Sequence, residues 1–296
     1  MTIKELYNIF LQNPSICTDT RKIEKGSIFF ALKGDNFNGN KFVSQAIDQG
    51  CSFAIIDEER YQSPKAILVN DVLETLQELA TYHRNQLRIP VIGITGTNGK
   101  TTSKELINAV LSSGIKCYST KGNLNNHIGV PLSLLKITNT HEIAIIEMGA
   151  NHKGEINFLC NISKPTHGVI TNIGSAHLEG FKNLQGVIDT KKELYDFLKE
   201  TNGHLFVNND DDLLLSLSEG IERTTYGNNG DYKGVKTKNT PFISLEFNGL
   251  KLSSNLIGDY QFNNIMLAIC IGNYFKITNE NIKTAIEDYT PTNNRS

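Results

Sequence analysis

Gly93-Ile-Thr-Gly-Thr-Asn-Gly-Lys-Thr-Thr102 is the stretch that decides the fold of this chain of 296 residues. Val91 to Thr95 predicts a short buried strand, and the glycines then turn the chain into a helix from about Lys100 to Ser113. Glycine lets backbone N–H groups approach phosphate oxygens closely, and a helix N-terminus adds partial positive charge. The stretch therefore predicts a phosphate-binding loop at a strand-to-helix junction.

The loop has the short form Gly-Thr-Asn-Gly-Lys-Thr-Thr. It departs from the strict spacing G-x-x-x-x-G-K-[ST], because position 94 is isoleucine. An ordinary glycine turn between strand and helix is the alternative interpretation. Lys-Thr-Thr directly after glycine at such a junction favours phosphate binding. In that role Lys100 contacts the β- and γ-phosphates of a nucleotide, and Thr101 joins the ligand shell of Mg²⁺.

Length and composition limit the class of protein. A chain of 296 residues is long enough for two domains with a substantial core. The formal net charge of −2 weakens the case for a nucleic-acid-binding surface. The 5 cysteines form no C-x-x-C pair, and no run of 18 apolar residues occurs. We therefore expect a cytoplasmic, soluble protein with no disulfide framework, no membrane insertion and no nucleic-acid partner.

The order of predicted strands and helices indicates two domains. Residues 1–88 predict a small α/β domain, and Arg88-Ile-Pro90 then breaks the pattern, since proline disfavours helix before it. Short apolar, β-branched runs separated by helices then predict a mostly parallel sheet covered on both faces. The strands expected in it are residues 91–95, 143–148, 168–173 and 204–207. The fold class is thus α/β, with a small N-terminal domain followed by a P-loop-type central domain.

The end of the chain has a different pattern. Residues 224–256 are rich in glycine and asparagine and contain short alternating pieces, which predict an antiparallel hairpin region appended to the sheet. Residues 263–274 predict a last, apolar helix.

Two polar residues follow predicted strands. Glu147 ends the apolar run 143–147, and His177 lies in the loop after the strand at 168–173. Ligands of an open parallel sheet bind at the carboxyl ends of its strands, where a carboxylate can bind Mg²⁺. Imidazole is the less usual ligand for this ion. A strand-end salt bridge for Glu147 and a loop role without chemistry for His177 are the alternatives.

Lys191 lies on the apolar side of a predicted helix at 184–198, whereas Lys192 lies at the edge toward water. A lysine on an inward face must be paired, extend its amine to solvent, or be chemically modified. The helical pattern alone leaves these three possibilities open.

Three segments resemble the Mur ligase family, the ATP-dependent amide ligases that build the peptidoglycan stem peptide. They are Gly122-Asn-Leu-Asn-Asn-His-Ile-Gly-Val-Pro131, Glu147-Met-Gly-Ala-Asn-His-Lys-Gly-Glu-Ile156 and Asn172-Ile-Gly-Ser-Ala-His-Leu-Glu179. Within the family they are most similar to the member that adds D-alanyl-D-alanine to UDP-N-acetylmuramoyl-tripeptide. The stretch from Thr18 to Gly34 is similar to that member's UDP-binding domain. The resemblance covers essentially the whole chain and implies ATP and Mg²⁺ as cofactors, those two substrates as partners, and a monomer.

The resemblance also implies site residues by position. Nucleotide binding falls to Gly96, Thr97, Asn98, Gly99, Lys100, Thr101, Thr102, Asn264 and Arg295. The implied Mg²⁺ ligands are Thr101, Glu147, His177 and Lys191, the last as a carbamate, and the implied catalytic residues are Lys100, Lys191 and His177. Substrate binding falls to Thr20, Arg21, Lys33, Asn38, Asn125 and Asn126. Tyr260 and Gln261 depart from the family's His-Asn pair, so detailed adenine contacts do not carry over.

By the same resemblance, residues 1–88 bind the UDP-substrate, residues 89–292 bind ATP, and residues 293–296 begin a hinge to a further domain. The implied reaction proceeds through an acyl-phosphate, and residues 1–296 alone are expected to bind ligands without completing ligation. A sister ligase that adds the third stem residue is an alternative, against which Glu147-Met-Gly-Ala argues. A non-catalytic nucleotide-binding module is another. Diaminopimelate and lysine both remain open as the third stem residue.

Overall fold

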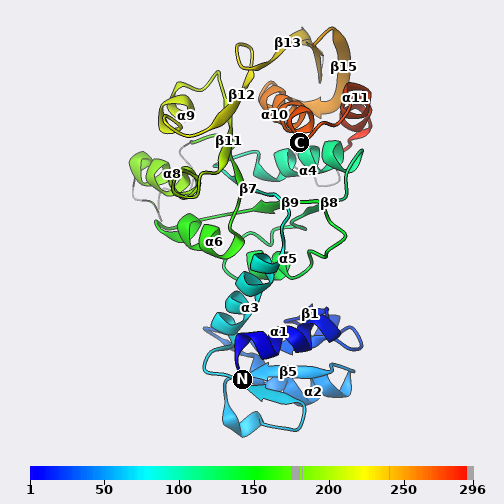
Figure 1. Cartoon of the computed structure of the whole chain (residues 1–296), viewed down its shortest axis with the longest axis vertical. Coiled ribbons are helices and arrows are strands. Elements are labelled where there is room, and N and C mark those ends of the chain that lie inside the picture. Colours follow the sequence, from blue (N-terminus) through cyan, green and yellow to red (C-terminus); the bar gives the residue numbers. More distant parts are fainter. Residues whose placement is uncertain (175–180, 182, 240, 292–296) are drawn as a thin grey trace. The chain divides into compact units, whose positions relative to one another are not determined.

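The computed structural model describes residues 1–174, 181, 183–239 and 241–291. Its contacts divide the chain into two compact units, one of residues 1–88 with 127–138 and one of residues 89–126 with 139–296 (Figure 1). The sequence assigns residues 127–138 to the second domain, but they pack with the first unit, because α5 (Gly129–Leu134) lies against α3 (Val72–Gln86). The assignment of a UDP-substrate and an ATP to separate domains stays a prediction.

The first unit is built on a parallel sheet with strand order β1-β2-β5-β6, as the α/β pattern predicts. A short antiparallel pair, β3 and β4, follows β2. The strands are β1 (Ile16–Cys17), β2 (Ile28–Phe30), β3 (Lys33–Gly34), β4 (Phe37–Asn38), β5 (Phe53–Ile56) and β6 (Ala66–Leu68). The remaining helices are α1 (Ile3–Gln12), η1 (Thr20–Lys22), η2 (Gly39–Phe42), α2 (Val43–Asp48) and η3 (Glu59–Tyr61).

His83 on α3 joins three segments of this unit. Its Nε2 lies 2.8 Å from the Ile137 carbonyl oxygen and its Nδ1 lies 3.1 Å from the Tyr7 hydroxyl of α1. Since a carbonyl can only accept, Nε2 donates and Nδ1 accepts the tyrosine proton. Burial lowers the pKa of His83, which keeps the ring in this neutral form. This link explains why residues 127–138 belong to the first unit.

The second unit contains a nine-stranded sheet with strand order β15-β14-β13-β12-β11-β10-β7-β9-β8. Its strands are β7 (Val91–Thr95), β8 (Cys117–Ser119), β9 (Ile143–Glu147), β10 (His167–Ile170), β11 (His204–Asn208), β12 (Arg223–Gly227), β13 (Tyr232–Asn239), β14 (Phe242–Phe247) and β15 (Leu250–Ile257). Its helices are α4 (Lys100–Ser112), α6 (Glu155–Ser163), α8 (Leu184–Glu200), α9 (Asp212–Leu217), α10 (Gln261–Tyr274) and α11 (Asn279–Asp288). Among the helices that the structure describes, none is long and apolar enough to cross a membrane.

The hairpin region expected at residues 224–256 needs a correction at its start. β12 pairs in parallel with β11 and so extends the central sheet, and β13 also begins parallel to β12. Only β13, β14 and β15 form the antiparallel meander. The glycine- and asparagine-rich turns misled the sequence analysis, because they follow a buried parallel strand whose Tyr226 is 1% exposed.

The two faces of β7 are covered by different helices. Ile92 and Ile94 join an apolar cluster with residues of α4 and α10, and α10 and α11 lie beside α4 (Figure 1). Side chains alternate between faces along a strand, so Gly93 faces the other side. A Cβ atom at Gly93 would lie 3.3 Å from Leu194 Cδ1 of α8. The central strand is thus sandwiched between helices, as a covered parallel sheet requires.

Two histidines lie in an aromatic cluster of the second unit. The ring centroid of His167 lies 5.9 Å from that of Phe206 and 5.5 Å from that of Tyr274. The ring centroid of His204 lies 5.9 Å from that of His167. Burial, together with the nearby His204, lowers the pKa of His167 to about 4.

We expect the second unit to lose stability as the pH falls from about 6.5, the ordinary histidine pKa, to about 4. In that window the unfolded chain binds a proton that native His167 does not, so stability rises with pH. The contribution is at most about 3 kcal/mol. His167→Phe keeps an aromatic ring and should flatten this part of the dependence in urea unfolding. His152→Phe, at an exposed position of the same unit, is the control; equal pH dependence of the His167 variant and the unaltered chain would contradict the argument.

Candidate functional site

The glycine-rich loop joins β7 to α4, where the sequence predicts a strand-to-helix junction. Gly99 precedes α4 with a φ of 76°, a backbone conformation that favours glycine. Gly96 has a φ of 144°, and a Cβ atom there would lie 2.1 Å from Thr171 Oγ1. Gly99 has no side chain to cap the first N–H groups of α4, which suits an anion at this helix N-terminus.

The segment after β10 holds the loop in place. The Asn172 carbonyl accepts from Thr97 N at 3.0 Å, and Asn172 Oδ1 accepts from Asn98 N at 3.0 Å. Asn172 Nδ2 and Thr171 Oγ1 both donate to the Asn98 carbonyl, at 2.9 Å and 2.6 Å. Asn172 belongs to one of the segments that resemble the family, but its anchoring role is not predictable from the sequence. The loop is therefore fixed by protein contacts from the segment that follows a neighbouring strand.

Lys100, the first residue of α4, turns its amine back over the loop. Its Nζ donates to the Gly96 carbonyl at 2.7 Å and to the Thr97 carbonyl at 3.0 Å. Thr101 and Thr102 follow in the first helical turn and are partly exposed. The positive charge thus lies over the glycines, where a phosphate group would meet it.

Glu147 lies beside the loop because β9 pairs in parallel with β7 and its register sets Glu147 opposite Ile94. The carboxylate is buried, and its Oε1 accepts from Asn125 Nδ2 at 2.9 Å. Its Oε2 lies 3.1 Å from Lys104 Nζ. The structure therefore brings together the loop, Glu147 and Asn125, three parts of the site that the sequence names separately.

Lys104 is a buried residue of this site that the sequence did not predict. It is 2% exposed, and its amine also donates to the Gly122 carbonyl at 3.3 Å. A signal was present, since Lys104 follows Lys100 by four residues and so lies on the same side of α4. It also falls among the buried positions Ser103, Ile107 and Leu111 of that helix. The helical-pattern argument made for Lys191 applies equally to it.

Lys191 is buried on α8, where its helical position predicts an inward face. It is 4% exposed, so its amine does not extend to solvent, and Nζ lies 5.6 Å from the ring centroid of Phe181. Burial, and secondly the charge of Lys100, lower the pKa of Lys191 to about 8. Lys192 instead faces outward and pairs with Asp196 one turn later. The two adjacent lysines thus have opposite environments.

Asn264 on α10 also reaches the loop. Its Oδ1 accepts from Ser103 Oγ at 2.9 Å, and its Nδ2 donates to Gln261 Oε1 at 2.8 Å. A Cβ atom at Gly99 would lie 3.1 Å from Asn264 Oδ1. The amide therefore joins α10 to the loop and α4, and Gln261, one of the departures from the family pattern, fixes its orientation. Its contact with adenine stays a prediction.

The remaining predicted residues of this site are placed only in part. Asn126 is exposed next to Asn125. His177 and Arg295 lie outside the described residues, so their predicted roles stay predictions.

The side chains by the loop fit the chemistry of Mg²⁺. Glu147 Oε2 is buried and accepts no hydrogen bond from the described residues, and Thr101 lies in the first turn of α4. Mg²⁺ binds to oxygen, commonly through one or two carboxylates plus phosphates and waters. Over the described ranges, no three His, Cys, Asp or Glu side chains gather in one place. A cation bound by Glu147 would take further oxygen ligands from the nucleotide phosphates.

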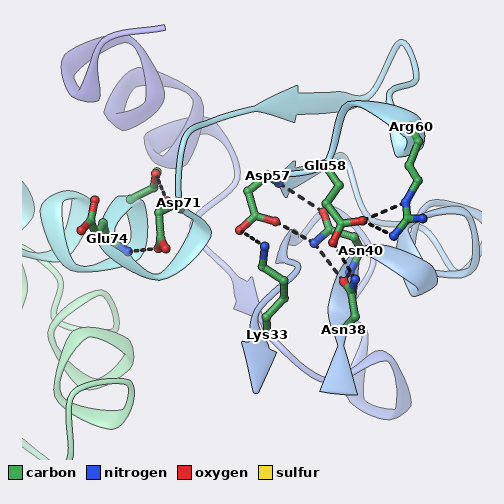
Figure 2. A network of polar contacts seen from close by, with 9 residues as sticks. Lys33, Asn38, Asn40, Asp57, Glu58, Arg60, Asp71 and Glu74 are labelled. Carbon is green, nitrogen blue, oxygen red and sulfur yellow. Dashed lines mark hydrogen bonds and ion pairs between the residues drawn. The ribbon is translucent and has the colours of Figure 1, made fainter. Parts of the chain in front are cut away.

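A second candidate site lies in the first unit, in the polar network of Figure 2. Lys33 Nζ lies 3.0 Å from Asp57 Oδ2, and Asn38 Nδ2 donates to Glu58 Oε1 at 2.7 Å. Asn40, which the sequence analysis missed, lies between them and donates to Asp57 Oδ1 at 2.8 Å. This network fixes Lys33 and Asn38 on the short pair of strands β3 and β4.

Thr20 and Arg21, the other predicted residues of the first unit, lie in η1. Asp19 precedes this turn and accepts from the Arg21 side chain at 2.9 and 2.8 Å. The Arg21 side chain is 85% exposed. Its guanidinium is therefore held by Asp19 while remaining open to solvent.

Comparison with known proteins gives one family for both units. The Mur ligase middle domain matches residues 94–272, and the catalytic domain of the Mur ligase family matches residues 15–97. The UDP-N-acetylmuramoyl-tripeptide–D-alanyl-D-alanine ligase of Bacillus subtilis is 36% identical over 286 residues, which are 90% of this chain and 59% of that protein. The enzyme of that name from Haemophilus influenzae is 33% identical over 96% of this chain and 65% of its own length. The chain thus spans about three-fifths of these relatives.

Solved structures of two MurF enzymes are similar in fold to this chain. MurF from Acinetobacter baumannii has a TM-score of 0.87 at 29% identity, and the match covers 99% of this chain and 69% of that one. MurF ligase from Thermotoga maritima, solved in complex with ADP, has a TM-score of 0.82 at 27% identity, with 95% and 67% covered.

We expect Gly96→Ala to destabilise the second unit by about 1–3 kcal/mol, the usual cost of overpacking. The added methyl would displace Thr171 and break its hydrogen bond to Asn98. Urea unfolding measures the change. Gly174→Ala is the matched control beside the same loop, because a Cβ atom there meets only ordinary contact at 3.7 Å. Equal stability of the two variants would show that Gly96 is not sterically required.

Proposed function

Because the chain belongs to the Mur ligase family, we propose that the protein joins D-alanyl-D-alanine to UDP-N-acetylmuramoyl-tripeptide with ATP, in synthesis of the peptidoglycan stem peptide. The names of the relatives from Bacillus subtilis and Haemophilus influenzae support this substrate pair. The ADP-bound MurF neighbour supports the nucleotide. Since both ATP and a UDP-linked peptide are required, we also propose that the reaction takes place in the cytoplasm.

The observation that carries the proposal is the convergence of a phosphate-type loop, a buried carboxylate and a buried lysine in the second unit. The loop amides and Lys100 would bind the nucleotide phosphates. Glu147, Thr101 and a carbamate on Lys191 would hold Mg²⁺, which neutralises charge on the transferring phosphoryl group when bound. His177 is proposed as a further ligand from the family resemblance alone. Lys33, Asn38, Thr20 and Arg21 are proposed for the UDP end of the substrate.

In the proposed reaction an oxygen of the tripeptide's terminal carboxylate attacks the γ-phosphorus of ATP and ADP leaves. The amine of D-alanyl-D-alanine then attacks the carbonyl carbon of the acyl-phosphate, an amide bond forms, and inorganic phosphate and a proton leave. Phosphoryl transfer depends chiefly on positioning and charge stabilisation. Lys100 would counter charge on the γ-phosphate, while Asn125 and Asn126 would orient the muramoyl-peptide.

The proposal is tested by phosphate release from the full-length protein. Release should require UDP-N-acetylmuramoyl-tripeptide and D-alanyl-D-alanine together. Running the assay with diaminopimelate-containing and lysine-containing tripeptides identifies the third stem residue. Phosphate release with a UDP-dipeptide and a free amino acid instead would assign the sister activity. No ligand-dependent turnover would favour a non-catalytic nucleotide-binding module.

We expect Lys100→Ala to weaken binding of an ATP analogue by about 10- to 100-fold, since a charge-assisted hydrogen bond contributes about 1.5–3 kcal/mol. Calorimetry on residues 1–296 measures this affinity. Lys116→Ala removes the same charge from an exposed site in the same unit and should leave the affinity unchanged. If both variants bind as tightly as the unaltered chain, the loop is not the phosphate site.

We also expect Lys191, and not Lys192, to carry a carbamate. The neutral Nζ attacks the carbon of CO₂, a C–N bond forms, and the nitrogen proton passes to solvent. The resulting anion replaces a cationic amine in a buried position, where Mg²⁺ would compensate it. With ¹³C-labelled bicarbonate, Mg²⁺ and an ATP analogue, a carbamate carbon signal should appear in the NMR spectrum.

The matched pair of variants makes this experiment specific. The carbamate signal should vanish in Lys191→Ala and persist in Lys192→Ala, because Lys192 faces outward and pairs with Asp196. A signal that disappears only in Lys192→Ala would reverse the assignment.

A further inference from the structure

Lys104 connects three parts of the second unit: helix α4, the end of strand β9 and the segment at Gly122. It lies on α4, its Nζ is 3.1 Å from Glu147 Oε2 at the end of β9, and it donates to the Gly122 carbonyl at 3.3 Å. Its side chain is 2% exposed and that of Glu147 is 3% exposed. One side chain of α4 therefore contacts both the proposed cation ligand and the segment that leads to Asn125.

Asn125 contacts the same carboxylate from another side. Its Nδ2 donates to Glu147 Oε1 at 2.9 Å, and its carbonyl accepts from Gly149 N at 2.8 Å. The Glu147 backbone N–H in turn donates to Thr120 Oγ1 at 3.1 Å. Among the described residues, Asn125 contacts one carboxylate oxygen of Glu147 and Lys104 of α4 contacts the other. The carboxylate plane is fixed by these two neighbours together.

The Lys104 contact differs in kind from the Asn125 contact. Oε2 accepts no hydrogen bond from the described residues, although the lysine amine lies close by. The amine therefore balances the charge of the buried carboxylate as an ion pair. A buried carboxylate without such a countercharge is costly and would seek other partners.

We infer that Lys104 is a positioning residue for the cation site: by pairing with Glu147 and binding the Gly122 carbonyl, it orients the carboxylate toward the metal of the nucleotide complex. This inference rests on the proposed function, because it needs a Mg²⁺–nucleotide at the loop. Lys104 itself does not touch the nucleotide or the metal. It acts as the partners behind metal ligands do, by fixing the ligand's orientation.

The test compares the affinity of residues 1–296 for a non-hydrolysable ATP analogue with and without Mg²⁺, by calorimetry. The quantity of interest is the ratio of the two dissociation constants. In Lys104→Met this Mg²⁺-dependent gain should fall by about 10- to 100-fold, the usual effect of losing a partner behind a metal ligand. The affinity without Mg²⁺ should stay as in the unaltered chain, because the loop amides and Lys100 are untouched. A purely structural role would lower both affinities together.

Two further variants keep the result interpretable. Glu105→Gln is the control, since it removes a charge from the adjacent residue of α4 and keeps an oxygen that can accept from the Tyr289 hydroxyl. It should leave the Mg²⁺-dependent gain unchanged. Lys104→Arg keeps the charge, so it decides the question if Lys104→Met does not fold. The guanidinium is too broad to contact Glu147 and Gly122 as the ammonium does, and the gain should fall here too.

The outcomes separate the inference from the function on which it rests. No binding of the nucleotide by the unaltered chain overturns the proposed function and the inference with it. Normal binding with an unchanged Mg²⁺-dependent gain in the folded Lys104 variants overturns the inference alone. A larger gain in Lys104→Met would also overturn it, since the lysine would then act only by repelling the cation.

Discussion

The parallel pairing of β7 with β9 on one side and β10 on the other is the constraint on which the second unit depends. This pairing sets Ile94 opposite Glu147 and Thr95 opposite Ile170. All three strands therefore end at one level, and the chain segments that follow them meet there. Backbone register brings the glycine loop, the carboxylate and the Thr171–Asn172 anchor to one edge of the sheet, and the bonds of Thr171 and Asn172 to Asn98 then fix the loop.

Glycines on β10 and β7 also explain how Lys191 can be buried close to the loop. Gly168 on β10 would place a Cβ atom 2.3 Å from Leu198 Cδ1, and Gly93 is similarly covered by Leu194. The missing side chains let α8 approach the sheet closely, which buries Lys191 one turn before Leu194. Burial of a charged amine such as that of Lys191 lowers the stability of the fold unless an opposite charge or hydrogen bonds compensate it. The lowered pKa of Lys191 reflects that cost.

Much of this arrangement could be predicted from local patterns. The apolar run before the loop, the glycines and the helical spacing around Lys191 each depend on neighbours in sequence, and the structure has β7, α4 and the inward Lys191 where they were expected. The burial of Lys104 follows from the same helical pattern, but its pairing with Glu147 on β9 could not be found in that way. The role of Asn172 could not be found either, because its partners Thr97 and Asn98 lie far away in sequence. The parallel β12 was mistaken for part of a hairpin for the same reason: strand direction depends on the partner, not on the turn residues.

The charges near the loop show what the arrangement is suited to bind. Lys100 lies over the glycines, and its charge is felt by Lys191, whose pKa falls partly for that reason. Lys104 is compensated by Glu147, so its charge is already balanced within the protein. Lys100 keeps its amine at the glycine loop, and burial disfavours the cationic form of Lys191. In the proposed function, a nucleotide triphosphate would place negative charge beside Lys100, and carbamate formation would convert the Lys191 amine into an anion. A site arranged in this way holds its dipoles and charges in place before the reaction, which is the condition under which electrostatic stabilisation of a phosphoryl transfer is most effective.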